Sequence, residues 1–468
     1  MIADIAVVGA GAAGLFAATW AGRRAHAGGS RPTILALDGA AKLGAKVLVA
    51  GGGRCNVTHH AVSSDDFAGS TPGAVRAVLA RWSVADTVAF FADLGVPLKR
   101  EPTGKLFPVS DDAHSVLDAL LRAARAAGAR LAHPWRVASV SADADGLFDI
   151  RRDTARDADT LARHPAGPDA DPVLRHDRVL ARRLILATGG MALPRSGSDG
   201  GGYAIASALG HSITEHVRPA LVPLILADAP PASTPNAPAP PNAPAAPAPP
   251  PPGVAEALRS LSGVAALATL RLHTGSGKRT HQATGPLLCT HFGLSGPAAL
   301  DISRHLTHLR HTDAGAHLRA SFLPALTTQA ADAMLLTARA LSPLRALCVP
   351  PHALPERLVR ALCALAGAPP AEPMTSLTKP ARRALAAALT DLPLPVTGDR
   401  GFTHAETTAG GVPLAELHLA TMASRAQSHL FVCGELCDVD GRIGGFNFQW
   451  AWASGHLAGV AAASSLAQ

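Results

Sequence analysis

The chain has 468 residues, more than one compact hydrophobic core normally organises, so two or three domains are expected. Hydrophobic residues make up 48% of the chain and aromatic residues only 4%, a composition typical of a globular protein. The net charge is +7, but no run of five or more basic residues occurs, so the charge alone does not predict nucleic-acid binding. The six cysteines form no CxxC pair, which argues against a zinc ribbon or a disulfide framework.

The apolar N-terminus has the hydropathy of a signal peptide, yet Asp4 stands where such a peptide carries positive charge. No other stretch of 18 residues is strongly apolar and uncharged. We therefore expect a cytoplasmic protein with no membrane partner.

The chain opens with a pattern typical of a βαβ unit. An apolar run over Ile2–Val8 predicts a buried parallel strand, Gly9 to Arg24 a helix, and Thr33–Leu37 a second strand that ends at Asp38. This order predicts an α/β fold with a Rossmann-like dinucleotide-binding domain.

Further elements follow in chain order. The expected features are a helix over 115–131, strands over 135–141 and 146–151, an exposed hairpin insertion over 153–176, a buried strand over 183–190, short strands and turns over 264–325, helices broken by proline over 328–392, and a strand, a glycine-rich turn and a helix over 428–468. Residues 229–252 contain 12 Pro and 8 Ala, which predicts a disordered or polyproline II excursion. The return to the opening pattern at the C-terminus predicts a discontinuous first domain with the middle of the chain inserted into it.

Residues 9–14, GAGAAG, match GxGxxG between the first strand and helix. Gly9 permits the tight turn, Gly11 lets the backbone approach a pyrophosphate, and Gly14 lets the helix pack on the strand. The helix N-terminus then faces the pyrophosphate charge. Asp38 follows Gly14 by 24 residues, where a carboxylate that binds ribose is expected, and an acid there favours FAD or NAD over NADP.

Three more glycine-rich segments favour FAD. They are AGGGRCN (50–56), ATGG (187–190) and GELCDVDGRIGGFN (434–447). An extended FAD needs several close backbone approaches, whereas a domain that binds NAD alone does not need a completing segment at the far C-terminus. Cys55, between Arg54 and Asn56, has two interpretations: a redox thiol of low pKa, or a packing residue in a loop whose shape matters.

Six ordered motifs carry a resemblance to a known family. They are GAGAAGL, GAKVLVAGGGRCNVTH, ATGGMALPRSGSDGGGYAIASALGH, GPLLCTHFGLSGPAALDISR, TTAGGV and CGELCDVDGRIGGFNFQWAWASG. Together they resemble the bacterial NAD(P)/FAD-dependent oxidoreductases of the aminoacetone oxidase family, also called dehydro-bile-acid reductase-like flavoproteins. The resemblance runs from residue 2 to about residue 460.

The resemblance implies a glutathione-reductase-like FAD domain over 1–215 and 400–468, an inserted β-rich domain over 216–327 and 393–399, and a small helical domain over 328–392. It also implies a set of residues that contact FAD. These are Gly9, Gly11, Ala12, Ala13, Gly14, Asp38, Lys46, Gly52, Gly53, Arg54, Cys55, Asn56, Val137, Thr188, Gly189, Gly190, Gly434, Glu435, Asp438, Gly444, Gly445, Phe446 and Asn447. Independently, amides at the helix that begins near Phe446 would stabilise negative charge on the reduced flavin.

The chain departs from the family pattern at His59, at the Asp199-Gly-Gly-Gly segment and at Cys289. His291 is a candidate acid or base on the substrate side of the flavin, with a structural histidine as the alternative. GSGKR (275–279) lacks the glycine spacing of a P-loop and predicts a hairpin turn. His305, His308 and His311 repeat on one predicted helix face, but no ligand pattern accompanies them, so no metal is expected.

We expect an FAD-dependent oxidoreductase with a small-molecule substrate and catalytic candidates His291, Arg54 and Asn56. Because no second dinucleotide motif appears, either the substrate reduces the flavin and oxygen reoxidises it, or NAD(P)H docks transiently. Three hypotheses remain open: an oxidase or dehydrogenase of an amine or alcohol, an NAD(P)H-dependent reductase of an activated C=C bond, and a flavoprotein that acts on RNA or another macromolecule. Nucleic acid is not the expected partner, and the oligomeric state is open.

Overall fold

The protein is described from a computed structural model that covers residues 1–143, 146–164, 171–227 and 253–467. The chain forms two compact units. Unit 1 contains Met1–Arg218 and Thr407–Gln468, and unit 2 contains Pro219–Glu406. The expected boundaries lay at 215/216 and 399/400, close to these divisions. The Pro-rich segment 229–252 lies outside the described residues.

Unit 1 is built on a sheet of nine strands, counted over the described residues, in the order β20-β21-β22-β10-β1-β2-β7, with β9 paired to β10 and β8. Its strands are β1 (Ile2–Val8), β2 (Ile34–Leu37), β7 (Ala129–Ala132), β8 (Val137–Ala142), β9 (Phe148–Arg152), β10 (Arg178–Leu186), β20 (Leu417–His418), β21 (Ala423–Ser424) and β22 (Leu430–Val432). The predicted opening βαβ unit is confirmed, because β1 and β2 are parallel neighbours joined by a helix.

The parallel strands of this sheet end at one common edge. Val8 pairs with both Leu37 and Leu186, and Leu186 pairs with Val432. The central strands are continuous apolar runs because helices cover both faces of a parallel sheet. The segments that follow these strands therefore emerge together, which is where α/β sheets bind ligands.

Helices and two small sheets complete unit 1. The helices are α1 (Ala12–Ala27), α2 (Ala45–Gly53), α3 (Pro72–Leu79), α4 (Val84–Asp93), α5 (Ala113–Ala126), α6 (Thr154–Arg163), α7 (Gly201–Ala208) and α14 (Phe446–Ser464). The small sheets pair β23 (Val439–Gly441) with β4 (Phe67–Gly69), and β6 (Lys105–Pro108) with β3 (Thr58–His59) and β5 (Leu98–Arg100).

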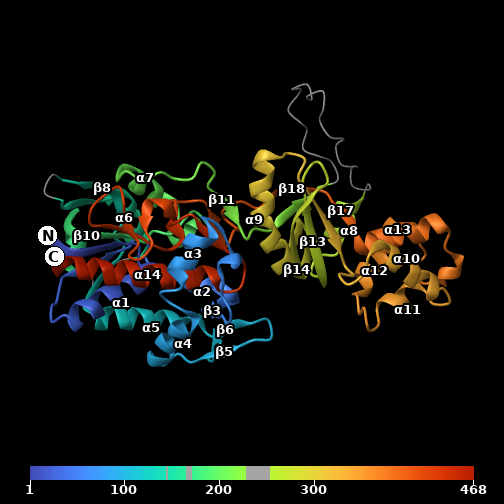
Figure 1. Ribbon diagram of the computed structural model, residues 1–468, viewed down its shortest axis with the longest axis horizontal. Coiled ribbons are helices and arrows are strands. Elements are labelled where there is room, and N and C mark those ends of the chain that lie inside the picture. Colours follow the sequence, from blue (N-terminus) through green and yellow to red (C-terminus); the bar gives the residue numbers. More distant parts are fainter. Residues whose placement is uncertain (144–145, 165–170, 228–252, 468) are drawn as a thin grey trace, which may run out of the picture. The chain divides into compact units, whose positions relative to one another are not determined.

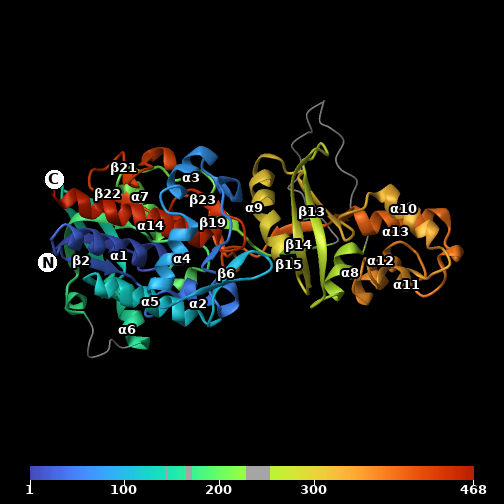
Figure 2. The ribbon, with the colours of Figure 1, turned by 60° about the horizontal axis from the view of Figure 1, so that its bottom comes forward.

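The last helix of the chain packs against the first, side by side in both ribbon views (Figures 1 and 2). A Cβ on Gly455 would lie 2.7 Å from the carbonyl oxygen of Ala13, and one on Gly459 would lie 2.2 Å from that of Ala17. Glycine at these positions lets the backbones of α1 and α14 approach closely. This contact joins the two ends of the chain in one unit and places the start of α14 near the start of α1.

The expected hairpin over residues 153–176 is wrong, because Thr154–Arg163 forms helix α6 and Pro172–Arg175 a 3₁₀ turn. Asp157 of α6 is buried and accepts a bond of 2.6 Å from Nε of Arg152, which is also buried. Its carboxylate accepts the backbone N–H of Arg136 as well. The segment looks polar because most of α6 is exposed, and its one buried residue, Asp157, is a charged group that is paired with arginine.

Unit 2 contains a sheet in the order β17-β16-β13-β14-β15-β12-β18 and a group of helices. The strands are β12 (Leu224–Leu226), β13 (Ala265–His273), β14 (Arg279–Thr290), β15 (Gly293–Ser295), β16 (His317–Ser321), β17 (Leu392–Leu394) and β18 (Val396–Asp399), and the helices are α8 (Val254–Ser260), α9 (Pro297–Thr312), α10 (Thr328–Thr337), α11 (Pro343–Leu347), α12 (Glu356–Leu365) and α13 (Lys379–Thr390). Strands β11 (Arg218–Ala220) and β19 (Thr407–Ala409) lie where the chain passes between the units.

The hairpin predicted at GSGKR is confirmed, because β13 and β14 pair in antiparallel and the backbone N–H of Thr274 bonds to the carbonyl of Lys278. The broken helices predicted over 328–392 are α10 to α13, but their status as a separate domain stays a prediction. Residues 264–325 are not only short strands and turns. They also contain the 16-residue helix α9, which lies against β14 (Figure 2).

Candidate cofactor-binding site

The first glycine motif lies at the carboxyl edge of the unit 1 sheet, and its three glycines meet three different demands. Gly9 has φ +96°, which favours glycine, and a Cβ there would lie 2.4 Å from the carbonyl oxygen of Ala187. A Cβ on Gly14 would lie 1.8 Å from the carbonyl oxygen of Gly9, so the helix packs directly on the turn. A Cβ on Gly11 would meet no protein atom within 4 Å. Gly11 therefore borders open space that a ligand can enter.

The N-terminus of helix α1 borders the open space beside Gly11. Gly11 is its N-cap residue and supplies no side-chain cap, and the first turn contains no acidic residue. The backbone N–H groups of Ala12 and Ala13 are thus available to an anion, as in phosphate sites at helix N-termini. A Cβ on Gly434 would lie 2.7 Å from the Cβ of Ala13, so the segment after β22 passes along the same helix end.

Asp38, the predicted ribose ligand, follows β2 at this edge. Its carboxylate accepts the backbone N–H groups of Ala10 at 2.7 Å and of Ala40 at 2.8 Å. Burial raises the pKa of the Asp38 carboxyl, while these two N–H donors and the nearby Arg136 oppose the rise. A carboxylate has about four acceptor positions, so Asp38 can hold the turn and still accept a ribose hydroxyl.

Arg136 is a polar neighbour of this site that sequence reasoning did not identify. Its NH1 lies 2.9 Å from the carboxylate of Asp199, and its guanidinium lies against Gly39, beside Asp38. Asp199, the first residue of the Asp-Gly-Gly-Gly departure, is therefore an ion-pair partner of Arg136. Val137, one of the residues expected to contact FAD, directly follows Arg136 at the start of β8. The position before Val137 gave no separate signal in the sequence.

The segment 50–56 forms a kinked loop within and after α2. Gly51, Gly52 and Gly53 have φ values of +59°, +71° and +86°, and Cys55 has φ +58°. A Cβ on Gly51 would collide with Phe107, whereas a Cβ on Gly52 would meet no atom within 4 Å. Glycine is therefore required at Gly51 by packing, while Gly52 again borders open space.

The Cys55 side chain is completely buried, and burial raises the pKa of its thiol to about 12. A thiol with this pKa contains almost no thiolate at neutral pH. The geometry therefore favours the packing interpretation of Cys55 over the redox thiol.

The side chains of Arg54 and Asn56 differ in their hydrogen bonding: Arg54 is paired with acidic residues, whereas the Asn56 amide oxygen has no partner among the described residues. NH1 of Arg54 lies 2.6 Å from Oε1 of Glu101 and 3.5 Å from Oδ1 of Asp111, and the guanidinium lies over the Phe107 ring at 4.0 Å. Asn56 is 7% exposed, and its Oδ1 is buried without a hydrogen-bond partner in the described part of the chain. A buried amide oxygen of this kind needs a donor, which a bound ligand can supply.

A second group of predicted residues meets where β10 and β22 end. Nζ of Lys46 lies 2.6 Å from Oε2 of Glu435, and Oε1 of Glu435 accepts the backbone N–H of Thr408. A Cβ on Gly190 would lie 2.4 Å from Oγ1 of Thr408. Three distant segments therefore meet here. Thr408 contacts both Glu435 and Gly190, and Lys46 joins the group through its ion pair with Glu435.

Packing requires glycine at one position of the Asp-Gly-Gly-Gly segment and at one position near it. A Cβ on Gly202 would lie 1.8 Å from Oγ1 of Thr188, and one on Gly189, which has φ +75°, would lie 2.5 Å from Oγ of Ser198. Gly202 thus stands where α7 packs tightly on the Thr188 segment.

The N-terminus of α14 lies against β3, which contains Thr58. Gly445 caps it with φ +92°, and a Cβ there would lie 2.6 Å from the carbonyl carbon of Thr58. Gly444 has φ +132°. Phe446 is buried, and the first turn contains no acid, so the helix presents uncapped backbone N–H groups. Both polar atoms of the Asn447 side chain bond to Gly441, which anchors the turn.

His59, the departure noted in the sequence, stacks on Phe446 with ring centroids 4.9 Å apart. Its ring nitrogens lie 2.7 Å from the carbonyl oxygen of Ala61 and 3.1 Å from that of Thr103. His59 is thereby fixed beside the start of α14.

Asp438, another residue expected to contact FAD, lies in a cluster with Asp440 and Arg218. Burial, together with the charge of Asp440, raises the pKa of the Asp438 carboxyl to about 6, and Arg218 opposes the rise. The remaining candidate, His291, belongs to unit 2, follows β14 and is exposed, with its ring edge-on to Phe292. Its role at the flavin stays a prediction.

Taken together, the residues of unit 1 fit an extended dinucleotide such as FAD. Two helix N-termini without caps, those of α1 and α14, provide N–H donors for the phosphates and for an anionic ring edge. Gly11 and Gly52 leave space that a Cβ would fill, and the amide oxygen of Asn56 needs a donor. Within the described residues, no group of His, Cys, Asp and Glu side chains is placed to hold a metal ion. No helix formed by these described residues is both long enough and apolar enough to cross a membrane.

Comparison with known proteins matches this geometry to a family and to curated relatives. The family model described as "HI0933-like protein Rossmann domain" matches residues 3–163 and 170–461. A 3-dehydro-bile acid delta(4,6)-reductase of Clostridium scindens is 32% identical over 462 residues, which cover 98% of each chain. A ribosomal RNA dihydrouridine synthase of Escherichia coli is 30% identical over 454 residues, 96% of each chain. Among solved structures, a 3-ketosteroid-delta4-(5alpha)-dehydrogenase of Rhodococcus jostii is 15% identical with a TM-score of 0.45, over 99% of this chain and 97% of that one.

Proposed function

Because the chain belongs to the family of HI0933-like proteins with a Rossmann domain and is an FAD-dependent oxidoreductase, we propose that it is a reductase of a C=C bond conjugated with a carbonyl group. One observation carries the proposal. Two curated relatives with different substrates, each at least 30% identical over 96% or more of the chain, have names that describe this same saturation. A steroid dienone and the uracil ring share a double bond that a neighbouring carbonyl activates toward hydride. The aminoacetone oxidase assignment is not part of the proposal.

Bound FAD supplies hydride transfer at N5. The residues of unit 1 would hold the cofactor and tune its potential. The uncapped N-terminus of α14 would stabilise negative charge on a reduced flavin ring bound beside it, which would raise the reduction potential of the flavin. Asn56 offers a fixed acceptor in a buried position, and the ion pairs of Arg54 with Glu101 and Asp111 hold the loop that carries it. Buried Cys55 supplies no nucleophile, which supports direct hydride transfer without a thiol relay.

NAD(P)H is the proposed electron donor. Saturation of a C=C bond consumes a hydride and a proton, so a reductant must recharge the flavin after each turnover. His291, exposed at the end of β14, is the candidate that delivers the proton to the carbon next to the carbonyl.

The test is anaerobic mixing of the purified FAD-loaded protein with NADH or NADPH. We expect rapid loss of the yellow flavin absorbance, followed by its return when a 3-oxo-4,6-diene steroid or a uridine-containing RNA is added. A steroid without a conjugated carbonyl is the matched control and leaves the flavin reduced. Bleaching by an amine or alcohol in the absence of nicotinamide would instead support the oxidase alternative and refute the proposal.

The charge distribution favours ribosomal RNA as a second candidate for the substrate. Residues 219–406 contain 15 Lys and Arg against 10 Asp and Glu, a net charge of +5, whereas the rest of the chain contains 27 against 25. An excess of positive charge in one unit is the electrostatic pattern of nucleic-acid binding. The discriminating measurement is the rate of flavin reoxidation by RNA compared with the steroid, at equal concentration.

A further inference from the structure

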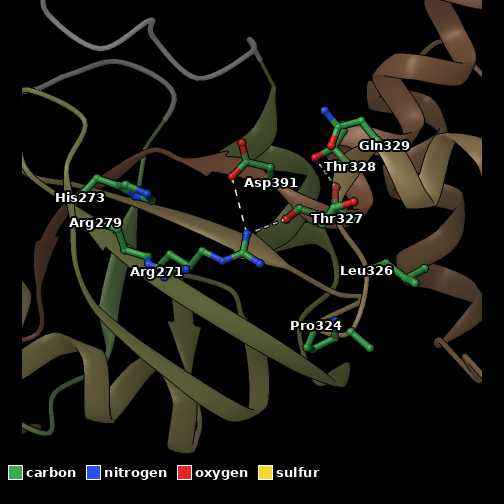
Figure 3. A pocket seen from close by; sticks show the side chains of 11 residues that line it. Arg271, His273, Arg279, Pro324, Leu326, Thr327, Thr328, Gln329 and Asp391 are labelled. Carbon is green, nitrogen blue, oxygen red and sulfur yellow. Dashed lines mark hydrogen bonds and ion pairs between the residues drawn. The ribbon is translucent and has the colours of Figure 1, made fainter.

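A cavity of about 660 Å³ lies in unit 2, between the β13–β14 hairpin and the segment that enters α10 (Figure 3). Arg271, His273 and Arg279 line it from the strands, and Thr328 and Gln329 line it from the start of α10. All of its lining residues belong to unit 2, so it is separate from the dinucleotide site of unit 1. Its volume is within the range of cavities that bind small ligands or nucleotide-sized groups.

Strand pairing concentrates positive charge beside this cavity. Arg271 pairs with Arg319 across β13 and β16, and the next pair on the same face is His273 with His317, whose rings stack 5.5 Å apart. Like charges directly opposite each other destabilise an antiparallel pair. The Arg271–Arg319 pair therefore has an electrostatic cost that an anion would relieve, whereas His273 adds no fixed charge because burial lowers its pKa.

One carboxylate partly offsets this charge. Oδ1 of Asp391 lies 2.8 Å from Nε of Arg319 and 3.8 Å from NH1 of Arg271, which also bonds to the carbonyl of Thr390. Figure 3 shows Arg271 directed toward Asp391. Asp391 thus pairs with Arg271 and Arg319. Among the described residues, none accepts a hydrogen bond or forms an ion pair with the guanidinium of Arg279.

Other groups in the cavity also favour an anion. Thr327 caps α10 by accepting the N–H of Ala330, which leaves the N–H groups of Thr328 and Gln329 without intrahelical partners. The first turn of α10 contains no acidic residue. Nδ1 of His273 is buried without a hydrogen-bond partner among the described residues. Positive charge continues outside the cavity to Lys278 at the tip of the hairpin.

We propose that this cavity binds a backbone phosphate of an RNA chain, with Arg279 as its main ligand and Arg271 as a second, pre-oriented by Asp391. Guanidinium groups bind phosphate oxygens in pairs, and backbone phosphates provide most of the affinity in protein–nucleic acid complexes. Lys278 directly precedes Arg279 at the tip of the hairpin, and residues 219–406 carry a net charge of +5, which favours a chain of phosphates over an isolated one. The inference rests on the second candidate function and adds the site at which unit 2 holds the RNA.

The test measures binding of a fluorescein-labelled, uridine-containing RNA hairpin to the FAD-loaded full-length protein by anisotropy, over a series of KCl concentrations. Arg279→Gln is expected to weaken binding about tenfold and to lower the salt slope by about one, because one phosphate contact is lost. Arg279→Lys is expected to retain most of the affinity. The matched control is Arg339→Gln, an exposed arginine just beyond the far end of α10, about 15 Å along the helix, which should leave Kd unchanged.

Three outcomes would overturn the proposal: equal affinity of Arg279→Gln and the unaltered protein, an equal loss with Arg339→Gln, or displacement of the RNA by NADPH but not by NADH. The last result would assign the cavity to the 2′-phosphate of the nucleotide. Flavin bleaching by NAD(P)H is recorded for each variant and should not change. If RNA fails to bind while bleaching persists, the inference fails and the reductase stands; if bleaching fails while Arg279-dependent RNA binding persists, the reductase proposal fails instead.

Discussion

Gly11→Ala separates the role of a residue in the fold from its role toward the cofactor. Gly11 has φ −80° and ψ −162°, an extended conformation that alanine adopts without strain, and its added Cβ would meet no protein atom within 4 Å. The protein without cofactor should therefore fold normally and gain about 0.4–1 kcal/mol from reduced entropy of the unfolded chain. The same Cβ enters the space that we propose for the pyrophosphate of FAD, and overpacking of one methyl group costs about 1–3 kcal/mol.

This cost corresponds to a rise in the Kd for FAD of roughly 5- to 150-fold. The assay is titration of the deflavinated protein with FAD, followed by flavin fluorescence, beside thermal unfolding of the same preparation. Gly73→Ala is the matched control, because Gly73 in α3 also has open space at its Cβ position and no positive φ. Unchanged affinity for FAD in Gly11→Ala would refute the placement of the cofactor, and a less stable deflavinated protein would refute the geometry of the turn.

Three further predictions concern the loop 50–56 and α14. Cys55→Ser should retain FAD and most turnover, because burial raises the pKa of the thiol to about 12 and removes it from chemistry; an inactive variant that still binds FAD would restore the thiol mechanism. Gly52→Val should lose FAD, measured as flavin absorbance per chain, since a β-branched residue at φ +71° costs about 1–3 kcal/mol and its side chain enters the open space; a fully yellow variant would contradict this. Burial lowers the pKa of His456 to about 4, so the unfolded chain binds the extra proton first and stability falls as the pH drops from about 6.5 toward 4. His456→Phe, which keeps a ring against Trp20 and Trp82, should remove about 2 kcal/mol of that dependence in urea unfolding at pH 7 and pH 4.5, and parallel pH profiles of the two proteins would rule out His456 as the cause.

The arginines beside the cavity of unit 2 form a cluster that the sequence does not show. Arg271, Arg279 and Arg319 are separated by 8 and 40 positions, so no basic run contains them. They come together because β13 pairs with β14 on one side and with β16 on the other. Charge that is dispersed along a chain becomes a patch only through strand register.

The sequence by itself determined the features that depend on local backbone requirements. The turn at Gly9, the packing of Gly14 and the position of Asp38 after β2 follow from conformations that particular residues permit, and the structure has each of them. The loop at Gly51 and Gly52 belongs to the same class, because positive φ values select glycine whatever the rest of the chain does.

Only the tertiary structure decided which distant groups meet. The polar sequence around Asp157 predicts a surface residue, whereas the structure buries Asp157 against Arg152. Arg136 has no signal in the sequence, and only the structure places it beside Asp38 and Asp199. Lys46 and Glu435 form an ion pair across 389 positions of sequence. The physical reason is that backbone preferences act within a few residues of the chain. Burial and charge pairing depend instead on which elements pack together, and the type of a residue does not indicate which distant residue it will contact.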